Sequence, residues 1–141
     1  SRLDNIQAAI INLKLKYFET NNINRKKIAN IYFAKLNNIK EINLPKTEKD
    51  SEHIYHQFTI IVKNGMRDAL KKKLDNDNID TFIYYPKPLH LQKAFKNIIK
   101  FKTKPSVSEE ISKQVLSLPI HPNMKINQAK YVIKMIKEFY E

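Results

Sequence analysis

Residues 84–92 carry the side chains best placed to do chemistry. Their sequence, YYPKPLHLQ, sets two tyrosines and His90 around two prolines. Proline fixes the backbone φ angle, so this segment is stiff and extended. Phenol and imidazole groups both donate hydrogen bonds, and a stiff segment that follows a strand can aim them at a ligand. Tyr84, Tyr85 and His90 are therefore candidate ligand-contacting residues, and a stiff loop with core aromatics is the alternative interpretation.

Three other histidines invite a metal or catalytic interpretation. Glu52, His53 and His56 lie close together in the sequence, and His121 lies between two prolines. On a strand, side chains three positions apart point to opposite faces, so His53 and His56 would diverge, and no third ligand is near. We expect no metal site here, and we interpret these histidines as structural or surface residues.

Arg2 stands at the start of an apolar helical pattern, beside Asp4. An acidic side chain near a helix start is favoured by the helix dipole, whereas an arginine is not. Arg2 is therefore a candidate for another role, with a frayed terminus as the alternative interpretation. The sequence offers no nucleophile and base at a spacing that argues for catalysis.

Composition excludes several kinds of site. The 141 residues suit one domain, with one Gly and no Cys. Phosphate cradles, dinucleotide-binding turns and calcium loops need glycine at fixed positions that Gly65 alone does not supply, and disulfides, zinc ribbons and thiol nucleophiles need cysteine. No stretch approaches the roughly 20 apolar residues of a membrane span. With no signal peptide and no cysteine, we expect a cytoplasmic protein.

The formal charge of +12 comes from 26 Lys and Arg against 14 Asp and Glu. Only three of the basic residues are Arg, the side chain that grips guanine and phosphate with a planar fork. The lysines are spread along the chain, and Lys71–Lys73 is the only triple. We expect no membrane partner and no specific nucleic-acid partner, and keep a basic nucleic-acid-binding domain as the alternative function.

The elements that must position these residues begin with a long helical pattern. Apolar residues at steps of three and four start at Leu3 and continue, past a soft break at Asn21-Asn22, to Asn37-Asn38. The pattern predicts one long helix or two abutting helices, with the first part buried on more than one side. Asn at the end is suited to a left-handed exit from the helix.

The remaining chain alternates short strands and helices. The prediction places a short strand or extended segment at 39–45, strands at 53–62 and 79–85, a turn at Asn64-Gly65, and helices at 66–74, within 89–101, at 106–116 and at 127–140. Ser106 and Glu109 are spaced as a capping box. We predict an α+β fold with a small, mostly antiparallel sheet covered by helices. Residues 1–38 form the leading helix or helix pair, and 39–141 form the small α+β domain.

Four segments together resemble one known family. SRLDNIQAA at 1–9 resembles its N-S-R-L-D-x-x-Q-A-A segment, and RDAL at 67–70 resembles its R-D-x-L helix start. YYPKPLHLQ at 84–92 resembles H-Y-P-x-P-x-H-L-Q, and LSLPIHP at 116–122 resembles L-S-L-P-x-x-P. All four occur in the family's order and cover the chain from end to end. The sequence therefore resembles the DegT/DnrJ/EryC1/StrS sugar aminotransferases.

The resemblance implies a pyridoxal-phosphate enzyme of the aspartate-aminotransferase fold, fold type I, usually a homodimer. It would move an amino group from glutamate to a keto group of a nucleotide-linked sugar, for glycan or surface polysaccharide biosynthesis. The match covers the small C-terminal domain and the helix leading into it. The cofactor-binding lysine, the acid beside the pyridine nitrogen and the phosphate loop would lie upstream. We therefore expect no catalytic residue here, with pyridoxal phosphate bound mainly by the missing N-terminal domain.

The resemblance also assigns places to single residues. Arg2 matches an arginine near the partner subunit's active site, and His90 matches the second histidine of its segment, near the sugar. Tyr84 stands where the family usually has the first histidine, so a role that needs a protonated imidazole is in doubt there. The wording of this segment is closer to members acting on 3-keto-6-deoxy sugars than to 4-keto members. A non-catalytic relative of the family is a further alternative.

Overall fold

The computed structural model describes residues 3–95 and 105–141. Their elements, in chain order, are helices α1 (Asn5–Leu15) and α2 (Phe18–Leu36), strands β1 (Ile42–Asn43) and β2 (Phe58–Val62), helix α3 (Arg67–Asn76), 3-10 turns η1 (Leu89–Leu91) and η2 (Lys93–Phe95), helix α4 (Ser106–Ile111), strand β3 (Val115–Leu118) and helix α5 (Ile126–Tyr140). None of the helices in these ranges has the length and apolar character needed to cross a bilayer.

The three strands form one antiparallel sheet in the order β1-β2-β3. The central strand β2 pairs Val62 with Ile42 of β1 and Phe58 with Leu118 of β3. An isolated antiparallel bridge joins Phe82 to β3. The predicted α+β fold with a small antiparallel sheet is therefore confirmed.

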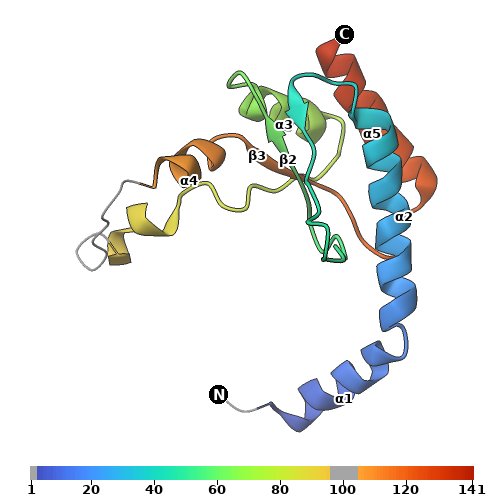
Figure 1. Ribbon diagram of the computed structural model, residues 1–141. Helices are drawn as coiled ribbons and strands as arrows, with labels where there is room; N and C mark the ends of the chain where they lie inside the picture. Colours follow the sequence, from blue (N-terminus) through green and yellow to red (C-terminus); the bar gives the residue numbers. More distant parts are fainter. Residues whose placement is uncertain (1–2, 96–104) are drawn as a thin grey trace.

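Alternation along β2 decides which face of the sheet the helices cover. Successive side chains of a strand point to opposite faces, so Phe58, Ile60 and Val62 share one face of the sheet. All three are fully buried, and this is therefore the face that the helices cover. Helices α2, α3 and α5 supply the rest of this core, and α2 and α5 run side by side in Figure 1. Tyr32 of α2 packs on Phe58 with ring centroids 5.0 Å apart and donates a 2.8 Å hydrogen bond to the carbonyl oxygen of Pro119.

Two tyrosines in this body predict a loss of stability at alkaline pH. Burial raises the pKa of the Tyr32 hydroxyl, and burial together with Glu41 raises that of Tyr140 to about 12. An unfolded tyrosine ionises near pH 10, so the unfolded state loses its protons first as the pH rises. The stabilisation is complete below pH 10 and is lost as the pH rises through about 12.

Urea unfolding between pH 9 and 12 measures this effect. The free energy of unfolding should fall across this range, and Tyr140→Phe should fall less steeply because one ionisable hydroxyl is gone. An identical slope for the two proteins would contradict the assignment.

The leading segment is a helix pair, as one of the two predicted forms allowed. The break lies at Lys16–Tyr17 and not at Asn21-Asn22, which is inside α2 with Asn22 buried. The end near residue 37 is confirmed, but Asn37 keeps right-handed helical angles (φ −61°), so a left-handed exit at that residue is wrong.

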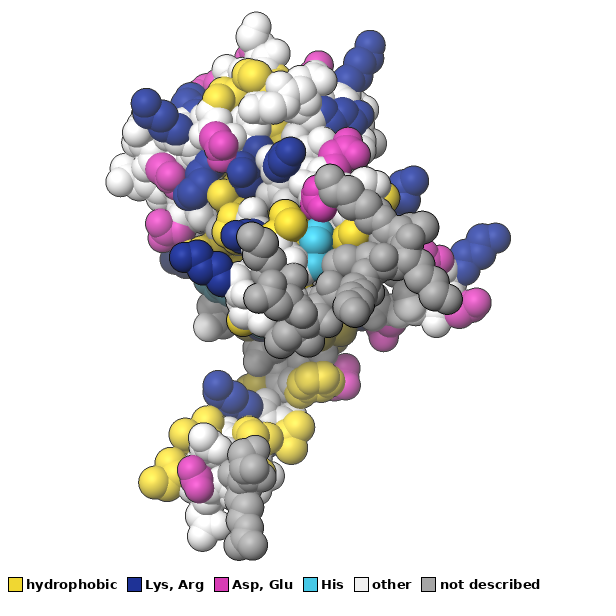
Figure 2. All heavy atoms as spheres, turned by 90° about the vertical axis from the view of Figure 1, so that its left-hand side faces the viewer, with side chains coloured by type: hydrophobic (Ala, Val, Ile, Leu, Met, Phe, Trp, Pro, Cys, Tyr) yellow, Lys and Arg dark blue, Asp and Glu magenta, His cyan; other side chains and the backbone are white. Residues whose placement is uncertain are grey.

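Helix α1 differs from the prediction in its surroundings. It projects from the body in Figure 1, and Figure 2 shows hydrophobic side chains on this projecting part. None of its residues is buried, and Ile6 is 77% exposed. The predicted burial on more than one side is therefore wrong for the described residues, because none of the other described elements packs over this helix.

All three predicted strands are shorter than expected, and of residues 39–45 only Ile42–Asn43 form β1. Residues 53–57 precede β2 without joining it, since Tyr55 has a left-handed φ of 51° and its amide donates a 2.8 Å hydrogen bond to Nδ1 of His53. This local turn interrupts the extended backbone that a strand needs. Of the predicted strand 79–85, only the bridge at Phe82 forms.

The region from 89 to 118 holds the largest departures. Two 3-10 turns replace the first part of the helix predicted within 89–101, and the rest of that prediction lies outside the described residues. Helix α4 ends at Ile111, and Val115–Leu118 form β3, all four buried. Ser106 is the first helical residue and makes no capping hydrogen bond, so the capping box is wrong. The turn at Asn64-Gly65, both with positive φ, and helices α3 and α5 confirm their predictions.

Candidate functional site

A groove of about 730 Å³ lies between β3, the segment after α3 and the first half of α5. We call it the main groove. It combines apolar walls with hydrogen-bonding groups, which is the usual character of a small-molecule site. Its lining includes the polar residues His56, Asn78, Asp80, Tyr84, His121 and Asn127 and the apolar residues Phe82, Leu118, Ile120 and Met124.

The exit from α3 directs the chain along this groove. Asn78 takes a left-handed φ of 58° just after the helix. The amide of Ile79 bonds to the carbonyl of Leu74 at 2.9 Å, and that of Asn78 to the carbonyl of Asp75 at 3.1 Å. This is the Schellman arrangement, in which Asn is one of the few residues that tolerate the left-handed position. The chain therefore leaves α3 at a fixed angle.

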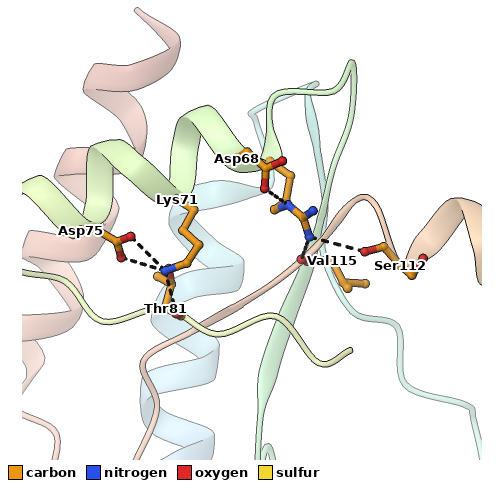
Figure 3. A network of polar contacts seen from close by, with 7 residues as sticks. Asp68, Lys71, Asp75, Thr81, Ser112 and Val115 are labelled. Atoms are coloured by element: carbon orange, nitrogen blue, oxygen red, sulfur yellow. Dashed lines mark hydrogen bonds and ion pairs between the residues drawn. The ribbon is translucent and has the colours of Figure 1, made fainter. Parts of the chain in front are cut away.

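A lysine and a backbone bridge hold the next residues in place. Lys71 Nζ donates to both carboxylate oxygens of Asp75, at 2.9 and 3.0 Å, and to the carbonyl oxygen of Thr81 at 3.2 Å (Figure 3). One residue further, Phe82 and Ser117 exchange two backbone hydrogen bonds, at 3.2 and 2.7 Å. Residues 79–84 therefore form a fixed wall of the main groove.

A second clamp holds the approach to β3. Arg67 lies at the start of α3 with its side chain 11% exposed. Its Nη1 lies 3.4 Å from the carbonyl oxygens of Ser112 and Val115, and its Nε lies 2.5 Å from a carboxylate oxygen of Asp68 (Figure 3). The guanidinium group thus ties α3 to the turn between α4 and β3. The R-D-x-L motif supplies this clamp.

The main groove brings together histidines that the sequence analysis interpreted as structural or surface residues. The antiparallel register pairs Phe58 with Leu118, so the residues just before β2 and just after β3 lie at the same end of the sheet. His56 and His121 therefore line the same groove as Tyr84. The signal was the proline-flanked position of His121, but the pairing of β2 with β3 could not be read from the sequence, because the first two residues of β3 were predicted as the end of a helix.

The predicted site residues separate in the structure. Tyr84 lines the main groove, where its ring stacks on that of Phe82, with centroids 5.8 Å apart and planes inclined by 14°. Tyr85 is 71% exposed and lines a second groove, of about 880 Å³, with residues of α4. Tyr84 lines both grooves. Arg2 lies outside the described residues.

His90 is directed at α4 and does not line either groove as described. Its Nε2 lies 3.0 Å from Oε1 of Glu109, and the two side chains are 11% and 21% exposed. This contact joins η1 to α4, two elements whose contacting residues lie 19 positions apart in the sequence. His90 thus helps to hold the Tyr84–Gln92 segment against α4. Glu109, which was predicted to cap the helix, contacts His90 instead.

The charges of the described residues do not favour the nucleic-acid alternative. Lys71 pairs with Asp75, and Lys73 with Asp77 at 2.5 Å, a hydrogen bond that raises the pKa of Lys73. On the face shown in Figure 2, acidic side chains lie among the basic ones. In the ranges 3–95 and 105–141, no three His, Cys, Asp or Glu side chains are grouped so that they could hold a metal ion.

Comparison with known proteins agrees with these motifs. The sequence profile of the DegT/DnrJ/EryC1/StrS aminotransferase family matches residues 1–137. The chain is 36% identical over 141 residues to the dTDP-3-amino-3,4,6-trideoxy-alpha-D-glucose transaminase of Streptomyces venezuelae. That match covers 100% of this chain and 37% of the relative.

Solved structures give the same result. A crystal structure of DesV from S. venezuelae superimposes with a TM-score of 0.92 and 35% identity, covering 99% of this chain and 37% of that one. The structure of NtdA from Bacillus subtilis, with bound cofactor PMP, superimposes with a TM-score of 0.84 and 31% identity, covering 97% and 32%. The chain thus spans about 37% of the length of its first relatives. It belongs to the DegT/DnrJ/EryC1/StrS aminotransferase family.

Proposed function

We propose that the chain is the C-terminal part of a pyridoxal-phosphate-dependent aminotransferase. The whole protein would move an amino group from glutamate to a keto group of a nucleotide-linked sugar, 3-keto- or 4-keto-6-deoxy, for glycan or surface polysaccharide biosynthesis. The observation that carries the proposal is the match to the family along residues 1–137, with the chain spanning about 37% of the relatives' length. The proposed fold division is a helix pair at 1–38 and a small domain at 39–141.

The described lining of the main groove does not by itself fit a pyridoxal phosphate site. Covalent attachment needs a lysine facing the site, and the phosphate needs backbone amides or cationic side chains around it. Among the described residues that line the main groove, none is Lys or Arg. The cofactor would therefore be held mainly by an N-terminal domain, which by the family resemblance carries the lysine. Bound there, the cofactor would supply the electron sink for transamination.

The main groove is then one wall of the substrate pocket. Its hydrogen-bonding side chains, among them Tyr84, would bind and orient the substrate, and its apolar walls would exclude water. By the family resemblance we also propose that Arg2 and His90 lie near the substrate. The contact of His90 with Glu109 would hold His90 in position there. By the same resemblance we propose a homodimer in the cytoplasm, which light scattering and cell fractionation would test.

The test uses the longer protein of which this chain is the C-terminal part. Incubated with glutamate and with 3-keto or 4-keto dTDP-linked sugars, it should release one 2-oxoglutarate for each amino sugar formed. Its sequence should carry Asn immediately before Ser1 and a lysine well upstream, after a serine-rich stretch. Another residue at that lysine position would identify a non-catalytic relative and overturn the proposed activity.

For the 141-residue chain alone we predict neither tight cofactor binding nor turnover. The described lining of the main groove contains no Lys or Arg side chain that would hold the phosphate. After incubation with pyridoxal phosphate and dialysis, the chain should retain no visible absorbance from bound cofactor, and with glutamate and a keto sugar nucleotide it should release no 2-oxoglutarate. Retained absorbance with a stoichiometry near one would contradict the prediction.

The nucleic-acid alternative makes a different prediction. Binding that depends steeply on salt and is lost when Lys71–Lys73 are replaced would support it. Since two of these lysines are engaged with Asp75 and Asp77, we expect no binding of duplex DNA or RNA at physiological salt.

A further inference from the structure

We infer that Phe82, stacked on Tyr84 in the main groove, is the platform on which the base of the nucleotide-linked substrate lies. The inference rests on the proposed function and specifies which part of that substrate the groove takes. Aromatic rings that are exposed and fixed bind nucleobases by stacking, since every base offers a flat face. The observations that carry it are the exposure, the rigidity and the chemistry around Phe82.

The ring of Phe82 is both exposed and fixed. The residue is 54% exposed, although its backbone exchanges two hydrogen bonds with Ser117 of the buried strand β3. Its ring lies nearly parallel to that of Tyr84, 5.8 Å away between centroids. Phe82 does not belong to the hydrophobic core of the described residues, so packing within residues 3–95 and 105–141 does not account for an aromatic side chain at this position.

The groove around Phe82 suits an uncharged planar group. Its described lining contains no Lys or Arg, and it contains the carboxylate of Asp80, which repels a phosphate. Asn78 and Asn127 bring side-chain amides to the same groove. An amide group offers a donor and an acceptor side by side, which matches the imide edge of uracil or thymine. The base therefore fits the groove better than the diphosphate does.

The test is saturation-transfer NMR with thymidine 5′-diphosphate and the 141-residue chain. Magnetisation should reach the thymine methyl and H6 protons more strongly than the deoxyribose protons. Phe82→Ala should weaken binding about 5- to 150-fold, the effect of removing a stacked aromatic. Phe82→Tyr keeps a ring and should bind within about threefold of the original chain, by the same stacking argument. Phe18→Ala is the matched control, because Phe18 is 50% exposed and lies outside the groove.

In this NMR measurement, three results would overturn the inference. They are no transfer to the thymine protons, equal binding by Phe82→Ala and the original chain, and equally strong transfer to glucose 1-phosphate, which carries sugar and phosphate but no base. The measurement needs no turnover, so it is separate from the proposed function. If the longer protein aminates a nucleotide sugar and Phe82→Ala leaves its KM unchanged, the function stands and the base platform is wrong. If the chain binds the base but the longer protein catalyses no transamination, the base platform stands and the proposed function is wrong.

Discussion

Replacing Phe58 by alanine should lower the free energy of unfolding by about 3–5 kcal/mol, the cost of emptying a large buried site. Phe58 is fully buried at the start of the central strand. Its ring contacts Tyr32 at 5.0 Å and Phe33 at 5.1 Å between centroids, so its loss leaves a cavity lined by aromatic edges. The stability of a domain of this size is about 5–15 kcal/mol, so this loss is a large fraction of the total and the variant should unfold at a clearly lower urea concentration.

Urea denaturation followed by circular dichroism measures this loss. Phe82→Ala is the matched control, since it makes the same change at a side chain that is 54% exposed. We expect it to unfold within about 0.5 kcal/mol of the original chain, as surface substitutions usually do. If both variants lost the same stability, Phe58 would not be the centre of the core.

Replacing Arg67 by methionine should cost about 2 kcal/mol, because hydrogen bonds from a charged donor contribute about 1.5–3 kcal/mol. The substitution keeps most of the apolar stem but leaves the carbonyl oxygens of Ser112 and Val115 without the guanidinium group, whose Nη1 lies 3.4 Å from each. The turn between α4 and β3 should open more often. Amide hydrogen exchange at residues 112–115 should therefore accelerate by more than that of α5.

Asp68→Asn separates the clamp from the surface ion pair. The Asp68 side chain is 80% exposed, so its pairing with Arg67 contributes little in water. We expect this variant to unfold within about 0.5 kcal/mol of the original chain and to exchange at the original rates. Faster exchange in Asp68→Asn than in Arg67→Met would show that the ion pair, and not the carbonyl contacts, holds the turn.

The helices with a clear period were predictable from the sequence, and the strand β3 was not. Apolar residues of α5 recur at helical spacing over 15 residues, which leaves one interpretation. Val115–Leu118 is four residues long and buried throughout, so it has no alternation to show. Short apolar runs cannot be assigned from periodicity alone, and the first two residues of this one were joined to the preceding helix. The left-handed Tyr55, which ends the extended backbone before β2, has no such sequence signal either.

The site was predictable only where one segment carries it. Tyr84 was identified because the prolines that stiffen its segment lie in the same few residues, and it does line the main groove. His56 and His121 are 65 positions apart in the sequence, and the pairing of β2 with β3 brings them to the same groove. The contact of His90 with Glu109 similarly depends on where α4 ends.

The bridge between Phe82 and Ser117 also bears on how the protein behaves at high concentration. Strands at the border of a sheet present unpaired backbone groups that can recruit a strand from another molecule. Here β1 has only two residues, and the outer side of β3 already exchanges two hydrogen bonds with Phe82. The sheet is therefore a poor template for intermolecular β-pairing. Any self-association of this chain should proceed through side-chain surfaces and leave its β-content unchanged.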